Sequence, residues 1–135
     1  MTKESFSRWC RAYGHAWGAR DPDAAAALFA PDACYCETPF TAPMRGQEAI
    51  RAYWEAAVRT QRDITFSYFV LGVSGARGLA HWQAAFIRVP GNARVWLDGI
   101  LAVEMNKAGL CRTFREWWHR RETHPPVSKT MDACS

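Results

Sequence analysis

The stretch RVWLDGILAVEM, residues 94–105, decides the fold because apolar residues occur along it at alternating positions. A period of two is typical of a β-strand, in which successive side chains point to opposite faces. The period persists over most of the second half of the chain, which turn-forming residues interrupt at 74–77, 90–92 and 106–109. This pattern predicts an antiparallel meander of four long strands, over residues 64–73, 78–89, 94–105 and 110–121.

The first half of the chain carries a helical period instead. Apolar residues recur there at spacings of three and four, which predicts helices over residues 4–19, 24–30 and 47–61. Asp21 or Asp23 is expected to cap the second helix, which should end before Pro31. A short strand is expected at residues 32–37, followed by a loop or edge strand at residues 39–43.

Helices followed by a meander predict an α+β domain whose helices cover one face of an antiparallel sheet. The 135 residues suffice for one domain with one core. Residues 122–135 have no periodicity, so we expect them to form a mobile tail. Both faces of the strand at residues 94–105 are largely apolar, whereas a sheet with one wet face should alternate cleanly. We therefore expect a homodimer that packs through the outer sheet face.

Composition limits the classes of partner. The formal net charge is +4, from 17 basic and 13 acidic residues, without the clustered basic stripe of a nucleic-acid-binding protein. No run of apolar residues approaches the length of a membrane span, so no membrane contact is expected. Five Cys residues without a CxxC pair, behind an N-terminus without an apolar signal core, predict a cytoplasmic protein with free thiols. No metal-ligand spacing and no Gly-rich phosphate loop occurs, so we expect neither a metal nor a cofactor.

Two carboxylates interrupt the apolar strands near the C-terminus. Asp98 and Glu116 each lie among apolar and aromatic residues, where an ionised carboxylate has a large desolvation cost. If the loop at residues 106–109 gives an even register, Asp98 faces Glu116 across the hairpin, and the two would share one proton near neutral pH. A shift of one residue separates them onto opposite faces.

Three phrases, in this order and spacing, resemble the SnoaL-like branch of the nuclear transport factor two-like superfamily. They are DPDAAAALFAPDA at residues 21–33, RGQEAIRAYW at residues 45–54 and FREWWH at residues 114–119. The resemblance spans residues 4–121 and implies a cone-shaped, curved sheet that encloses a deep apolar pocket with the first helices. It also implies a dimer. It implies no single activity, because the superfamily includes isomerases, cyclases, epoxide hydrolases, dehydratases and noncatalytic proteins.

The ketosteroid isomerase members of this superfamily suggest roles for particular residues. Tyr13 falls at their oxyanion-binding tyrosine and Asp98 at their protonated oxyanion-binding aspartic acid, a carboxyl group kept neutral by an apolar site. Their general-base aspartate is replaced by Thr38, which follows Glu37. Glu116 instead resembles an acidic catalytic residue of the limonene epoxide hydrolase members.

These observations predict an apolar pocket that binds a small apolar molecule with a carbonyl or enol group. Asp98 and Tyr13 would bind the developing oxyanion, while Glu116 or Glu37 would move the proton. The residues expected to contact the ligand are aromatic: Trp17, Tyr35, Trp54, Trp82, Trp96, Phe114 and Trp118. The alternative is a noncatalytic ligand-binding protein or a dimeric interaction module.

Each candidate also has a purely structural interpretation. Asp98 can mark a bulge with its carboxylate bonded to the backbone, Glu116 can form an ion pair with a nearby Arg, and Tyr13 can belong to the helix core.

Overall fold

A computed structural model describes residues 1–125 and contains the predicted elements in the predicted order. The helices are α1 (Lys3–Gly18), α2 (Pro22–Ala26) and α3 (Gln47–Arg59). The strands are β1 (Phe29–Cys36), β2 (Met44–Arg45), β3 (Gln61–Ser74), β4 (Arg77–Arg88), β5 (Arg94–Met105) and β6 (Cys111–Thr123). The first two residues of the predicted tail, 122 and 123, belong to β6, and residues 126–135 of that tail lie outside the described residues.

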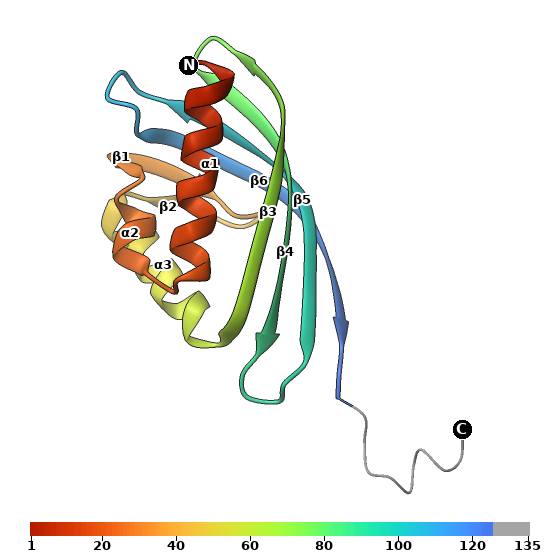
Figure 1. Cartoon of the computed structure of the whole chain (residues 1–135). Helices are drawn as coiled ribbons and strands as arrows, with labels where there is room; N and C mark the ends of the chain where they lie inside the picture. The colour runs from red at the N-terminus through yellow and green to blue at the C-terminus, as the bar shows by residue number, and fades with distance from the viewer. Residues whose placement is uncertain (126–135) are drawn as a thin grey trace, which may run out of the picture.

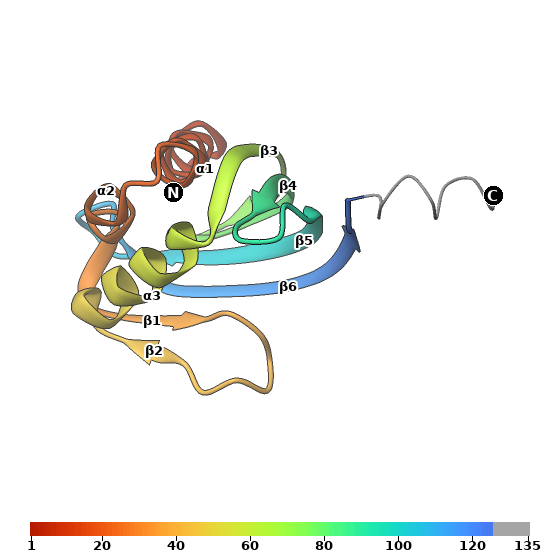
Figure 2. The same ribbon diagram turned by 90° about the horizontal axis from the view of Figure 1, so that it is seen from below.

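The six strands form one curved sheet in the order β2-β1-β6-β5-β4-β3. The meander from β3 to β6 is antiparallel as predicted, whereas β1 pairs with β6 in parallel. The three helices lie on the concave side of this sheet, which we call the inner face (Figure 1). Seen from below, the sheet curls around α3, and α1 packs against β3 (Figure 2). The predicted α+β cone is therefore confirmed.

The second helix is shorter than predicted. Asp21 caps it by accepting a hydrogen bond from the backbone N–H of Ala24 at 3.1 Å, but the helix ends at Ala26 and not at Ala30. Phe29 and Ala30 belong to β1 instead. The ring of the following proline disfavours a helical conformation at Ala30, and strand pairing with β6 buries Phe29 completely.

Aromatic side chains fill the space between α1 and the sheet. Trp9 and Tyr13 stack with their ring centroids 5.3 Å apart, and Tyr35 stacks on Phe114 at 4.4 Å. Phe114 and Tyr35 are both fully buried, on β6 and β1 respectively. Because aromatic pairs add to the free energy of burial, this cluster fixes α1 against the parallel pair of strands.

A bulge sets the register of the hairpin between β5 and β6. Met105 pairs with Cys111, but Glu104 pairs with Thr113, so Arg112 is an extra residue in β6. This residue changes the register from even to odd over the rest of the hairpin. Asp98 therefore faces His119, and the predicted pairing of Asp98 with Glu116 is wrong.

Candidate functional site

A cavity of about 380 Å³ lies between the inner face of the sheet and the helices α1 and α3. Its volume is near the lower end of the range for small-molecule sites, about 300–1,000 Å³. Seven of the residues singled out in the sequence line it: Tyr13, Trp17, Glu37, Trp54, Trp82, Glu116 and Trp118. The structure thus brings both Glu116 and Glu37 to one cavity, together with four of the seven Trp residues of the chain.

Glu116 is the buried charged residue of this cavity. Its exposed fraction is 7%, and its Oε2 accepts a hydrogen bond from the Tyr35 hydroxyl at 3.4 Å. Burial raises the pKa of the Glu116 carboxyl well above its usual value, and the nearby negative charge of Glu37 raises it further. No ion pair within residues 1–125 involves Glu116. A neutral carboxylic acid is therefore the favoured form, which can donate a hydrogen bond or a proton.

Two tyrosines extend the polar end of the cavity. The Tyr13 hydroxyl lies 3.2 Å from the Tyr35 hydroxyl, which in turn donates to Glu116. Burial, followed by the charge of Glu116, raises the pKa of both phenols well above the usual value. Both tyrosines stay protonated near neutral pH and complete a chain of hydrogen-bond donors that ends at the carboxyl group.

Glu37 reaches the cavity from the end of β1. Its Oε2 accepts a hydrogen bond from the Tyr53 hydroxyl at 2.7 Å, and its backbone carbonyl accepts one from the Trp118 indole at 3.1 Å. These contacts to α3 and β6 fix the segment that follows β1. Glu37 is half-buried, so its carboxylate combines a defined position with access to water.

Asp98 does not reach this cavity. It lies on the outer face of β5, where its side chain is 55% exposed and contacts His81 and Gln83 at 2.8 Å each. These hydrogen bonds, that of Gln83 first, lower the pKa of the Asp98 carboxyl. The expectation of a neutral Asp98 beside Tyr13 is therefore wrong, because the bulge at Arg112 reverses which residues of the two strands share a face.

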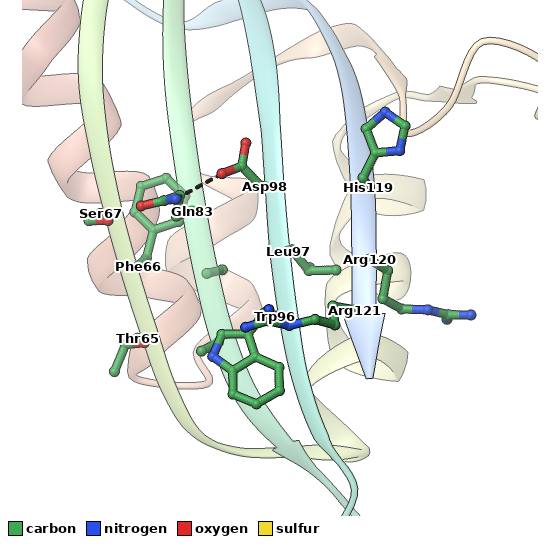
Figure 3. Close-up of a pocket in the computed structure, with 12 residues that line it drawn as sticks. Thr65, Phe66, Ser67, Gln83, Trp96, Leu97, Asp98, His119, Arg120 and Arg121 are labelled. Carbon is green, nitrogen blue, oxygen red and sulfur yellow. Dashed lines mark hydrogen bonds between the residues drawn. The ribbon is translucent and has the colours of Figure 1, made fainter. Parts of the chain in front are cut away.

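Trp96 also lies on the outer face, so the prediction that it lines the apolar pocket is wrong. It borders an open groove of about 580 Å³ together with Asp98 and His119 (Figure 3). The Arg121 guanidinium lies over its ring at 4.6 Å, a cation–π contact. Tyr35 and Phe114 face inward but are fully buried beneath the cavity wall, where Tyr35 acts through its hydroxyl.

Five polar residues of the cavity were missed in the sequence: Tyr53, Thr60, Gln61, Arg88 and Arg120. Tyr53 stood out only as an apolar position of the third helix. Arg120 follows Phe114, Glu116 and Trp118 at intervals of two, so the strand period was a signal that it faces inward. Gln61 and Arg88 lie at strand ends that meet only in the folded sheet.

Two polar atoms in the cavity wall have no partner. The indole N–H groups of Trp54 and Trp82 are buried without a hydrogen bond within residues 1–125, whereas Trp17 donates to Gln61 at 2.7 Å. An unsatisfied buried donor costs about 1–3 kcal/mol. Within the same residues no group of three metal-ligating side chains occurs, and no helix is long and apolar enough to cross a membrane.

The family model of the SnoaL-like domain matches residues 10–114. The chain belongs to this family. The match begins within α1 and ends at Phe114, near the start of β6, so it includes Glu37 and the strands β3, β4 and β5 but not Glu116. No curated protein matches the sequence of this SnoaL-like chain.

Solved structures share the SnoaL-like fold at low sequence identity. RV0760c from Mycobacterium tuberculosis superposes with a TM-score of 0.79 at 17% identity, over 91% of this chain and 99% of that chain. The Δ5-3-ketosteroid isomerase from Mycobacterium sp. superposes with a TM-score of 0.76 at 15% identity, over 88% of this chain and 98% of that chain. SalBIII is an epoxide hydrolase/cyclase-like enzyme of pyran ring formation in salinomycin. It superposes with a TM-score of 0.72 at 19% identity, over 87% of this chain and 89% of that chain. At these identities the likeness establishes the fold alone.

Proposed function

We propose that the chain binds a small, mainly apolar molecule in the inner cavity and catalyses proton transfer next to its carbonyl or enol group. One observation carries this proposal: Glu116 is buried at the cavity wall with a raised pKa, bonded to Tyr35 and not to a cation within residues 1–125. A structural carboxylate in such a place would normally have a cationic partner. Perturbed carboxyl groups in cavities are typical of catalytic acids.

The two carboxyl groups of the cavity would have different roles. Glu37, which water can reach, takes a proton from the carbon next to the carbonyl group and returns it to another carbon. Glu116 donates its hydrogen bond, and then its proton, to the oxygen on which negative charge develops, and it takes this proton back when the carbonyl group re-forms. Tyr13 and Tyr35, through their linked hydroxyls, stabilise the carboxylate that Glu116 becomes when it gives up its proton. The reaction class is an isomerisation, with cyclisation or dehydration as related outcomes of the same proton transfers.

The wall of the cavity favours an aromatic or alicyclic ligand. Trp17, Trp54, Trp82 and Trp118 supply flat apolar surfaces for such a ligand. Proteins of the same fold act on or bind such molecules. They include the ketosteroid isomerase, a designed 17-OHP binder, and RV0760c in complex with estradiol-17beta-hemisuccinate. We extend their polycyclic, oxygen-bearing ligand class to this chain as part of the proposal.

The experiment measures binding and turnover separately. Quenching of Trp fluorescence should report binding of cyclic ketones, because four Trp residues line the cavity. Exchange of the proton next to the carbonyl for deuterium should then occur in wild-type protein and fall about 100-fold or more in Glu37→Gln, the scale of a lost general base. Glu48→Gln, exposed in the first turn of α3, is the matched control. Quenching without exchange in any ketone would favour the noncatalytic ligand-binding alternative.

We also propose that the outer sheet face binds a second copy of the chain. Four large apolar side chains are exposed there, Phe69, Leu71, Leu79 and Trp117. They lie on three strands. Trp117 pairs with Ile100, Ile100 pairs with His81, and His81 pairs with Phe69, so these residues form one row across the sheet. Sedimentation of wild-type protein should give the mass of a dimer, and Leu79→Lys should give a monomer. A wild-type monomer at tens of micromolar would contradict this proposal.

A further inference from the structure

The cavity differs in charge between its buried wall and its opening. Glu116 and the tyrosines form its buried polar end, whereas Ala56, Thr60 and Arg120 are the lining residues most exposed to solvent. These exposed residues come from the end of α3 and the end of β6, so the cavity opens between these two elements. A ligand that places its carbonyl at Glu116 would have its other end near Arg120.

Arg120 is the cation at this opening that no carboxylate within residues 1–125 neutralises. Arg88, the other guanidinium of the lining, pairs with Glu122 at 3.1 Å. No ion pair within residues 1–125 includes Arg120. A solvated surface Arg is ordinary, but this one borders an apolar cavity, where an anion that followed an apolar body into the opening would meet it.

We propose that the ligand carries an anionic group, a carboxylate, sulfonate or phosphate, at the end opposite its reacting oxygen, and that Arg120 binds this group. This inference rests on the proposed function, since it takes the cavity as the ligand site. A guanidinium binds planar and tetrahedral oxyanions through two parallel N–H groups, which adds orientation to attraction. The anion at the opening would hold the ligand with its carbonyl directed inward, away from the cation and toward the neutral acid.

The neighbouring arginine provides a control within the same strand. Arg121 points to the opposite face and lies over Trp96 in the outer groove, whereas Arg120 extends away from that tryptophan (Figure 3). Arg120 borders both the cavity and the outer groove, while Arg121 borders the groove alone. The two residues therefore separate an anion bound at the cavity opening from one bound on the outer face.

The test uses two fluorescent probes with the same apolar body, 1-anilinonaphthalene-8-sulfonate and the uncharged N-phenyl-1-naphthylamine. Arg120→Met should weaken binding of the sulfonate about tenfold and leave the dissociation constant of the neutral probe within twofold, since exposed charge pairs contribute modestly. Arg121→Met should leave both constants unchanged. Raising the NaCl concentration from 0.05 to 0.5 M should weaken binding of the sulfonate probe and leave binding of the neutral probe unchanged.

Each other outcome has a defined meaning. The assignment of the anion to Arg120 would be overturned if Arg120→Met weakened binding of both probes equally. It would also be overturned if Arg121→Met, and not Arg120→Met, weakened binding of the sulfonate. Ala57→Phe, which adds bulk at a half-buried lining position, tests the underlying site separately. If this variant keeps its melting temperature and binds the neutral probe as well as wild type does, the cavity is not the ligand site and the proposed function fails. If it loses the neutral probe, the cavity stands whatever Arg120→Met does.

Discussion

Replacing Glu116 with Gln should lower the rate of proton exchange on a bound ketone about 100-fold or more, while making the fold more stable at pH 8. The amide has nearly the same shape as the neutral acid and can accept the hydrogen bond from Tyr35, but it cannot give up a proton. The buried amide also cannot ionise, so the variant avoids the desolvation cost that the acid meets at high pH. Exchange rates by NMR and urea unfolding at several pH values measure the two effects.

The sign of the pH effect follows from the raised pKa of Glu116. Below pH 4.5, the ordinary pKa of the group, it is protonated in both the folded and the unfolded chain and does not change stability with pH. As pH rises above this value the unfolded chain ionises first, so wild-type stability falls until the folded-state pKa is passed. Glu116→Gln should therefore match wild type in stability near pH 4 and exceed it by a margin that grows as pH rises toward 8.

The exposed Glu48 of α3 provides the control, because Glu48→Gln should change neither the exchange rate nor the pH dependence. A wild-type rate in Glu116→Gln would remove Glu116 from the mechanism. If the stability of Glu116→Gln ran parallel to that of wild type from pH 4 to pH 8, the Glu116 carboxyl group would titrate normally. This result would contradict the raised pKa that its burial implies.

The placement of the carboxylates marks the boundary of what the sequence could predict. Strand period identified both β5 and β6, and within each strand it separated the two faces correctly. It could not relate the faces of one strand to those of the other, because that depends on whether the hairpin holds an even or an odd register. Arg112, one extra residue beside a turn, decided this. Asp98 consequently lies with His119 on the outer face, and Glu116 lies on the inner one.

Residues with local signals were predicted well, and residues assembled by long-range contacts were not. The helical period of α1 directed Tyr13 and Trp17 inward, and that of α3 did the same for Trp54. The hydrogen bond between Glu37 and Tyr53 joins the end of β1 to α3, and the link from Tyr35 to Glu116 joins two strands 81 residues apart. Neither contact leaves a periodic pattern, since each depends on the curvature of the whole sheet.

The second large effect is expected at Gly99, where β5 approaches β6 most closely. Gly99 is buried and pairs with Trp118. A Cβ atom at this position would lie 2.3 Å from the Trp117 carbonyl oxygen and 2.8 Å from the Trp118 Cβ. Backbone atoms cannot move aside as a flexible side chain would, so the two strands would have to separate. Gly99→Ala should therefore destabilise the protein by about 3 kcal/mol, the upper part of the range for overpacking.

Gly72→Ala is the matched control, since it also adds one methyl group to a strand glycine. Nothing lies within 4 Å of a Cβ at Gly72, and the substitution should leave the free energy of unfolding unchanged or raise it slightly by restricting the unfolded chain. Urea unfolding of both variants gives the comparison. Equal stability of the two variants would contradict the close approach of the two strands at Gly99.

Because Trp118 lines the cavity directly beside this approach, Gly99→Ala should also weaken binding of the neutral naphthylamine probe in the fraction that remains folded. This result would show that the close approach of β5 and β6 at Gly99 positions Trp118 and Glu116 at the cavity.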